Sequence, residues 1–244
     1  MAEIIGENTN NGGKMNYFKI YESADEKVIG MSPQISNAIY PTTFDSSNTL
    51  AMLSFSKANS FTEIPKGTLN KKANLSDLMS VSFFSGQLFI SHKFYNILKI
   101  PSGKGVEFLK TSLIKGHEEL KDYWIVNPYL TDYSFIDCSK CEFVFTDSMG
   151  KIEFERVVFD SSKDFIEAHL RNREEAPIIG YPKFRPLVIK RIAFKYDSEF
   201  DFFSVLGVKP SGIGYYVSER LKKEIEKQGC TGIVFKEPNE IYPY

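Results

Sequence analysis

The chain has 244 residues, 42% of them hydrophobic and 25% charged, which is typical of a globular protein large enough to bury a core. A net charge of −1 argues against a generally basic nucleic-acid-binding protein. No apolar run reaches the roughly eighteen residues of a membrane span, and the N-terminus lacks the charged-then-apolar order of a signal peptide. Three cysteines do not make a disulfide framework, so we expect a cytoplasmic protein with neither membrane nor nucleic-acid partners.

Composition divides the chain into three stretches. Residues 1–14 are rich in Asn and Gly, and we expect a disordered extension. Residues 15–84 read as a variable N-terminal region and residues 85–244 as an α+β region, although 15–244 as one continuous domain is an alternative.

Several elements are predicted in the first half. Tyr17–Tyr21 alternates as a strand, and Asn74 is placed to cap a short helix over 74–80. The aromatic and β-branched run Tyr123–Asn127 predicts a strand that Pro128 ends.

The second half reads as a meander followed by helices and a connector. Residues 135–159 predict antiparallel strands, with the side chains of Ile152, Phe154 and either Val157 or Val158 facing inward. Ser161 and Ser162 cap a helix through Leu170, and three prolines make residues 176–186 a rigid connector. The apolar stretch 199–206 predicts a short aromatic helix.

Residues 88–110 and 215–237 align without a gap at an offset of 127. Each has the order strand, Ser, short amphipathic helix, Gly, strand, and Ser is a favoured N-cap. The identical pairs are Ser91 with Ser218, Gly105 with Gly232, and Phe108 with Phe235. We therefore predict an α+β fold in which a mainly antiparallel sheet or meander is flanked by two related strand–Ser-capped helix–strand modules.

No catalytic, cofactor-binding or metal-binding set emerges from the motifs. The Cys138–Cys141 pair has no second pair to complete a zinc site, so ordinary thiols are the favoured interpretation. His169 is on the apolar side of its predicted helix and is interpreted as a core histidine, whereas His117 precedes a strand in a solvated loop. Ser91 begins a helix, where capping is the default role of serine.

Aromatic residues near acidic turns are the candidates for binding a protein partner. They are Tyr129, Asp132, Tyr133, Phe200, Asp201 and Phe202. The alternative, favoured for the phenylalanines, is that these rings pack in the core.

The C-terminal string from Tyr216 to Ile225, followed by Gly229 and then 231–235, resembles the closing signature of a family of bacterial immunity proteins. That family belongs to polymorphic toxin systems and was formerly known only as a domain of unknown function. The strand at 123–127 and the stretch 154–160 resemble the middle of the same pattern, so the resemblance covers roughly residues 85–237.

The signature positions are expected to be structural, as caps, turns and packed rings. They are Ser91, Gly105, Phe108, Trp124, Ser218, Leu221, Gly232 and Phe235. If Phe235 is a core residue, Phe235→Ala costs about 3–5 kcal/mol.

The resemblance implies that the chain binds a cognate protein toxin and neutralises it by direct stoichiometric complex formation, without a cofactor. Two alternatives stay open from the residues alone. One is a hydrolase or transferase with dispersed active-site residues, for which His117, His169 and the Asp137–Cys138 region are the candidates. The other is a regulatory module that binds a small ligand or a peptide.

Overall fold

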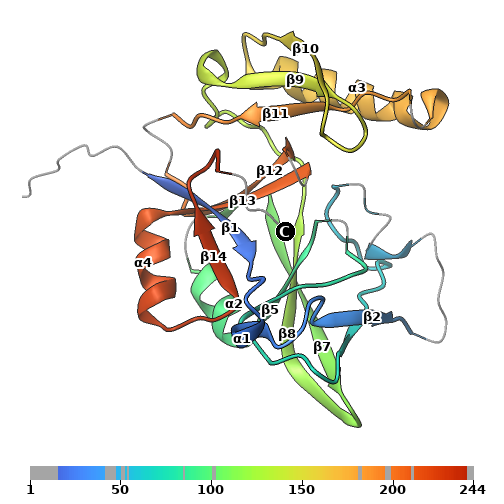
Figure 1. Cartoon of the computed structure of the whole chain (residues 1–244), viewed down its shortest axis with the longest axis vertical. Coiled ribbons are helices and arrows are strands. Elements are labelled where there is room, and N and C mark those ends of the chain that lie inside the picture. The colour runs from blue at the N-terminus through green and yellow to red at the C-terminus, as the bar shows by residue number, and fades with distance from the viewer. Residues whose placement is uncertain are drawn as a thin grey trace, which may run out of the picture.

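The computed structural model describes residues 16–41, 48–50, 53, 55–84, 86–100, 103–180, 183–195, 199–209 and 212–240. Over these residues the protein is a mixed α+β fold built on two curled, mainly antiparallel sheets (Figure 1). The predicted α+β class is confirmed at this level. The expected disordered extension at residues 1–14 lies outside the described residues.

The larger sheet has the strand order β10-β9-β11-β12-β13-β1-β14. The short strand β6 lies outside this order and pairs with β12. Its strands are β1 Tyr17–Glu22, β6 Gly103–Lys104, β9 Glu142–Thr146, β10 Glu153–Val157, β11 Leu187–Arg191, β12 Phe202–Val208, β13 Gly212–Ser218 and β14 Ile233–Lys236. The smaller sheet has the order β2-β3-β7-β8-β5-β4. Its strands are β2 Ile35–Ile39, β3 Lys66–Leu69, β4 Leu78–Met79, β5 Leu88–Ser91, β7 Val106–Lys115 and β8 Glu118–Pro128.

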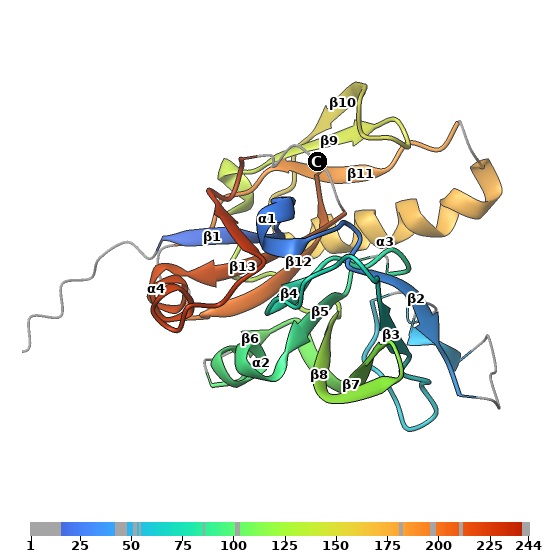
Figure 2. The same ribbon diagram turned by 60° about the horizontal axis from the view of Figure 1, so that its bottom comes forward.

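The α-helices of the described residues are α1 Glu26–Ile29, α2 His92–Leu98, α3 Ser162–Ile179 and α4 Glu219–Lys227, and a 3₁₀ helix covers Cys138–Lys140. Helices α2 and α4 contact each other on one side of the molecule, whereas α3 lies away from them against β11 (Figures 1 and 2). Strands from the stretch 15–84 enter both sheets, since β1 pairs with β13 and β4 pairs with β5.

The main hydrophobic core lies between the sheets and contains residues of both, such as Ile90 and Val126 from the smaller sheet and Phe203 and Val217 from the larger one. The hydroxyl of Tyr215 joins the sheets, because it donates to the carbonyl oxygens of Gly86, at 2.8 Å, and Val126, at 3.3 Å. A second cluster around Ile35, Phe89 and Ile125 fills the outer side of the smaller sheet.

Two predicted helices are strands. The stretch 74–80 contains β4, and the side chain of Asn74 donates to the carbonyl oxygen of Val28 instead of capping a helix. The stretch 199–206 contains most of β12, whose seven residues are all buried. A strand buried on both faces carries a continuous apolar run, which periodicity does not distinguish from a buried helix.

Two further predictions are corrected. Helix α3 starts at the Ser161 cap as expected but extends through Ile179, so Pro177 sits in its last turn and the rigid connector is shorter than predicted. Of the residues in and beside β10 that were expected to face inward, Ile152, Phe154 and Val158 are exposed, whereas Val157 packs against the main core. β10 is an edge strand of its sheet, and the ring of Phe154 lies under the guanidinium of Arg185, whose carbon is 4.1 Å from the ring centroid.

The two Ser-capped segments occupy matching positions in their sheets. We call β4, β5, α2, β7 and β8 unit 1, and β12, β13, α4, β14 and β1 unit 2. The matching pairs in register are Tyr123–Ser91 and Val126–Phe108 in unit 1, and Tyr17–Ser218 and Ile20–Phe235 in unit 2. The strand that completes unit 2 is therefore the N-terminal β1, far away in sequence.

The chain crosses between the units after each helix. After α4, the carbonyl oxygen of Thr231 accepts from the backbone N–H groups of Asp77 and Leu78 in unit 1. After α2, strand β6 pairs with Phe202 and Phe203 of unit 2. The two units are thus interlocked.

Candidate binding groove between α2 and α4

Helix α2 is fixed by a side-chain cap and an apolar stripe. The hydroxyl oxygen of Ser91 accepts from the backbone N–H of Phe94 at 3.2 Å. This satisfies one of the N–H groups in the first turn that have no partner within the helix. Phe94 and Leu98, four residues apart, are buried beneath the helix. The ring of Trp124 stacks on Tyr95 with centroids 3.8 Å apart, which holds the helix on β8.

Helix α4 is built in the same way. Ser218 accepts from the backbone N–H of Leu221 at 3.2 Å, and Leu221 and Ile225 form the buried stripe. Glu219 in the first turn and Lys227 in the last complement the helix dipole. Both predicted serine caps are observed.

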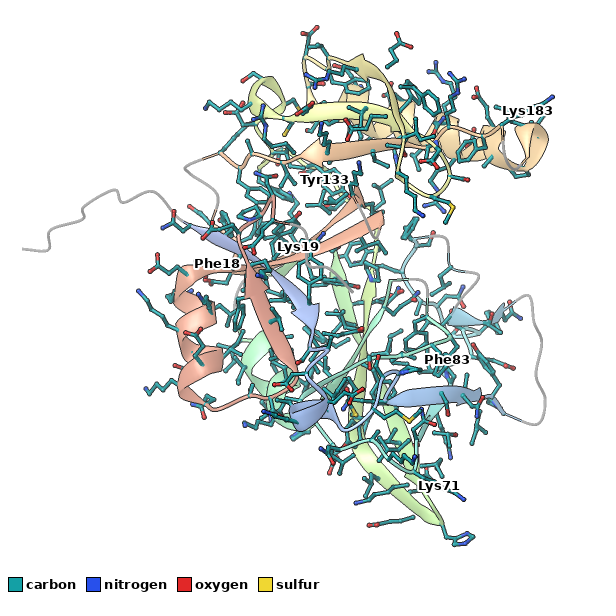
Figure 3. The ribbon with its side chains drawn as sticks, viewed as in Figure 1. Phe18, Lys19, Lys71, Phe83, Tyr133 and Lys183 are labelled. Atoms are coloured by element: carbon teal, nitrogen blue, oxygen red, sulfur yellow. The ribbon has the colours of Figure 1, made fainter. Side chains whose placement is uncertain are left out.

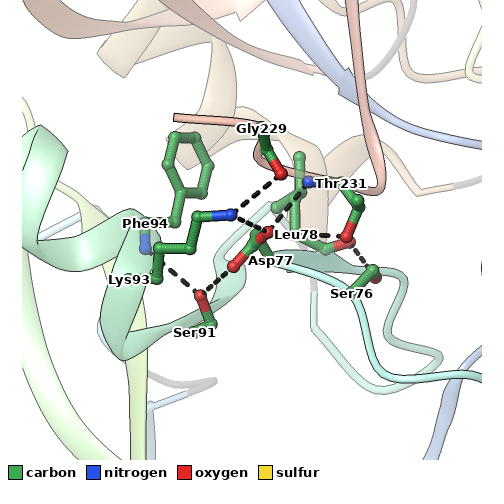
Figure 4. A network of polar contacts seen from close by, with 8 residues as sticks. All are labelled: Ser76, Asp77, Leu78, Ser91, Lys93, Phe94, Gly229 and Thr231. Atoms are coloured by element: carbon green, nitrogen blue, oxygen red, sulfur yellow. Dashed lines mark hydrogen bonds and ion pairs between the residues drawn. The ribbon is translucent and has the colours of Figure 1, made fainter. Parts of the chain in front are cut away.

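Each capping serine also donates to a buried aspartate. In unit 1, Ser91 donates to Asp77 Oδ1 at 2.6 Å, and Lys93 lies 3.4 Å from Asp77 Oδ2 (Figure 4). The same Oδ2 accepts from the backbone N–H of Thr231 at 2.9 Å. Lys93 Nζ also donates to the carbonyl oxygen of Gly229 at 2.8 Å, so this network reaches the end of α4. Asp77 therefore joins the two units.

In unit 2 the equivalent set is Asp201, Ser218 and Arg220. Ser218 donates to Asp201 Oδ1 at 2.5 Å, and the guanidinium of Arg220 pairs with Oδ2. Asp201 is 3% exposed, while most of the Arg220 side chain is in solvent. Charge-assisted hydrogen bonds of this kind compensate the desolvation of the carboxylate.

A groove of about 980 Å³ runs between the two helices. Its lining residues are His92, Lys93, Asn96, Ile97, Ile100, Glu199, Asp201, Arg220, Leu221, Glu224 and Gln228. Ile100, an apolar residue of the lining, is 80% exposed. Both aspartate networks border the groove, because each supplies its cation, Lys93 or Arg220, to the lining.

Three of the aromatic and acidic candidates from the sequence are buried. Phe202 is in the core and Asp201 is held in the network described above. Tyr133 lies below the sheet formed by β9 to β11, where its hydroxyl accepts from the backbone N–H of Leu206 at 2.9 Å (Figure 3). Burial raises the pKa of Tyr133 well above its usual value. Phe202 and Tyr133 are therefore not surface residues.

The other three candidates lie outside the groove lining. Asp132 is exposed and pairs with Lys104 at 2.5 Å; the hydrogen bonds from Lys104 and then Ser134 lower the pKa of Asp132 to about 2. The Lys104 ammonium also lies 4.9 Å from the centroid of the Phe200 ring. Tyr129 is apart from this pair, under the ammonium of Lys57 at 4.5 Å.

The candidate residues of the enzyme alternative lie in different environments. His169 Nδ1 is 3.0 Å from the carbonyl oxygen of Leu187, and burial lowers the pKa of this histidine. His117 is exposed at the turn between β7 and β8. Burial raises the pKa of the Cys138 thiol, and raises that of Cys141 to about 12, so neither is a ready thiolate. Within the described ranges, no three His, Cys, Asp or Glu residues are grouped to hold a metal ion.

The signature positions have structural environments. Gly232 has φ of 79°, and an added Cβ would collide with the carbonyl oxygen of Leu78. Gly105 has φ of 72°, and an added Cβ there would lie 3.0 Å from Ser204 Oγ, a less severe contact than at Gly232. Phe108 and Phe235 are half-buried and pack against the main core, so Phe235 packs as expected but is not fully buried. The ammonium of Lys222 lies 5.6 Å from the centroid of the Phe235 ring.

Sequence reasoning missed the aspartates as partners of the caps and Ile100 as an exposed apolar residue. The signal was present in part, since Lys93 and Arg220 match at the same offset of 127 as the two serines. Asp77 and Asp201 are 124 residues apart and lie in stretches interpreted as helices, which hid their relation.

No protein-family model and no curated protein matches this chain. Among the described helices, none has the length and apolar character needed to cross a membrane.

Proposed function

We propose that the chain is an immunity protein that binds a cognate toxin in the cytoplasm, and that the groove between α2 and α4 receives the toxin. The observation that carries the proposal is the groove itself, about 980 Å³ in volume, with Ile100 exposed at its mouth. A groove in which apolar side chains lie among charged ones is suited to binding a protein.

The chemistry of the lining supports a protein partner. Ile97, Ile100 and Leu221 supply the apolar part, and the rim carries both Arg220 and Glu224. Arginine is enriched at interfaces, and a rim of mixed charge confers specificity on a partner with the complementary pattern. A specific, stable complex buries about 1,200 Å² or more in total, so the partner would also cover the exposed faces of both helices.

The interlocked units support a rigid binding surface. We also propose that the two Ser-capped units are related copies of one module, because their strand registers, caps and aspartate networks coincide. In this account the groove is the contact between equivalent helices. Both of its walls are held by buried charge-assisted hydrogen bonds, which limits the entropy lost on binding.

A module for a small ligand or a peptide is the second candidate. Its support is the groove volume, which falls in the range of about 300–1,000 Å³ found for ligand pockets. Native mass spectrometry of the freshly purified protein tests it: a bound small molecule that Ile100→Asp removes supports this function over toxin binding.

The proposed immunity function is tested by toxicity rescue. The product of the neighbouring upstream gene is expressed alone, and then with this chain. We expect the neighbour to stop growth, and the chain to restore growth and to co-elute with it at fixed stoichiometry. A harmless neighbour, or rescue without a complex, contradicts direct neutralisation.

A matched pair of variants locates the interface. Ile100→Asp places a charge at the groove mouth and is expected to abolish rescue and co-elution without lowering the melting temperature. Ile178→Asp makes the same change at a side chain of similar exposure, 85%, on the distant helix α3, and should retain both. Equal behaviour of the two variants rules out the groove as the interface.

A further inference from the structure

The groove between α2 and α4 is lined by one row of side chains from each helix. On α4 the row is Arg220, Glu224 and Gln228, at intervals of four residues. On the α2 side the lining residues recur at the same interval, as His92 and Lys93, then Asn96 and Ile97, then Ile100 just past the end of the helix. Side chains four residues apart lie on one face of a helix, so the groove runs along both helices over about 12 Å.

The walls of the groove offer no sheet edge to a bound segment. The lining residues that do not belong to α2, α4 or the ends of these helices are Glu199 and Asp201, which precede β12, and no lining residue lies in a strand. An extended segment binds a sheet by pairing its backbone with an open edge, which this groove lacks. A segment that enters the groove must therefore bond its own backbone N–H and C=O groups, as an α-helix does.

The row on α4 presents a defined charge pattern. One guanidinium nitrogen of Arg220, Nη2, is held by the buried carboxylate of Asp201, while 81% of the Arg220 side chain is in solvent. A guanidinium has five N–H donors, so donors remain for an acceptor of the partner. Arg220 is thus an oriented donor at one end of the row.

Glu224, one turn further along α4, brings a negative charge. Its carboxylate accepts from Gln228 Nε2 at 2.8 Å. The ion pairs that α4 forms with the described residues do not include Glu224. Its charge is therefore left for a cation of the partner, whereas the charge of Arg220 is already compensated by Asp201.

Both walls also supply apolar side chains. Ile97 and Ile100 come from the α2 side, and Leu221 comes from α4. An amphipathic helix has the matching arrangement, because its apolar stripe is flanked by polar rows.

We propose that the groove receives a single amphipathic α-helix of the partner, whose apolar stripe packs on Ile97, Ile100 and Leu221. The helix carries Lys or Arg opposite Glu224 and, one turn away, Asp or Glu opposite Arg220. The spacing follows from the four residues between Arg220 and Glu224, since a helix lying along α4 repeats its side chains at the same interval. The inference rests on the proposed function for the identity of the partner, the toxin, and adds the element that the toxin presents.

A peptide selection tests the helix without the toxin. Random peptides of about 16 residues, long enough for about four helical turns, are selected from a display library on the immobilised full chain. Peptides that also bind Ile100→Asp are removed first. We expect the enriched peptides to share apolar positions three and four residues apart, with Lys or Arg four residues from Asp or Glu, and to gain helical circular dichroism on binding. No enrichment, or peptides with the alternating apolar pattern of a strand, overturns the proposal.

A matched pair of variants tests the charge pattern with a selected peptide. Glu224→Lys is expected to weaken binding about tenfold or more, because it places a like charge opposite the cation of the peptide. Glu226→Lys makes the same change on α4 at an exposed residue outside the lining, and should leave the affinity unchanged. Changing the cation of the peptide to Glu should restore its binding to Glu224→Lys. Fluorescence anisotropy measures the affinities, and a melting curve confirms that each variant is folded.

Equal losses in the two folded variants, or no restoration by the changed peptide, contradict the proposed pairing with Glu224. These outcomes are distinct from failure of the proposed function. Helical peptides that bind the groove, combined with failed toxicity rescue, would contradict neutralisation of the neighbour and support the helix-binding groove. Successful rescue with no helical peptide selected would overturn the helix and leave neutralisation standing.

Discussion

In both units 1 and 2 a helix-capping serine donates a hydrogen bond to a buried aspartate. The two aspartates differ in whether they also contact the other unit. Asp201 accepts only from Ser218 and Arg220 of its own unit among its side-chain contacts in the described residues. Asp77 accepts from Ser91 and Lys93 of its own unit and from the backbone of Thr231 in the other.

The two aspartates therefore differ in what they connect. At the Asp201 site the cation, Arg220, pairs with Asp201 and its side chain is mostly exposed. At the Asp77 site the cation, Lys93, is also tied to the carbonyl oxygen of Gly229. Unit 1 therefore supplies the contact between the units through Asp77, and unit 2 supplies the more exposed cation at the groove, Arg220.

The largest expected effect is at the two matching glycines. Gly232→Ala should destabilise the protein by about 4 kcal/mol or more, because its Cβ would collide with the backbone of Leu78 and its φ of 79° is unfavourable for alanine. Gly105→Ala should cost about 2 kcal/mol, since the nearest atom to its Cβ is Ser204 Oγ at 3.0 Å. Urea unfolding of both variants measures the change in the free energy of unfolding. Equal changes would contradict the tighter contact at Gly232.

The aspartates should follow the same order. Asp77→Asn is expected to cost about 3 kcal/mol, because its amide group faces donors from Ser91, Lys93 and the Thr231 backbone. Asp201→Asn disturbs two side-chain donors and should cost about 2 kcal/mol. Chemical denaturation measures both, and a larger loss at Asp201 would show that Asp77 is not the principal joint.

The paired phenylalanines should behave alike. Phe108→Ala and Phe235→Ala are each expected to cost about 2 kcal/mol, less than the roughly 3–5 kcal/mol of a fully buried ring, because both rings are half-buried. Thermal unfolding checks the pair. A loss of stability above about 4 kcal/mol for Phe235→Ala alone would indicate a fully buried ring, as the sequence predicted.

The smallest effect is expected at the caps. Ser91→Ala should cost about 1 kcal/mol and Ser218→Ala slightly more, since Ser218 is fully buried and Ser91 is not. Differential scanning calorimetry resolves the difference. A larger loss of stability for Ser91→Ala than for Ser218→Ala would mean that burial of the serine does not determine the loss.

The sequence predicted what depends on local patterns. The serine caps, the stripe formed by Leu221 and Ile225, and the strand ending at Pro128 follow from residues within one turn or one strand, and the structure confirms them.

The rest depends on contacts between distant residues. Asp77 has no local signature, because its partners Ser91 and Thr231 are 14 and 154 residues away. The sequence of β12 predicts a helix, because a strand that is buried on both faces has a continuous apolar run and lacks alternation. The groove arises only where α2 meets α4, so no single stretch of sequence indicates it.

The most direct test of the groove as the toxin-binding face is hydrogen exchange of the chain with and without the purified toxin. The account predicts that added protection on binding concentrates in α2 and α4, around Ile100 and Arg220, with α3 unchanged. Protection confined to α3 and the β9–β10 edge, with α2 and α4 exchanging as in the free protein, would contradict it.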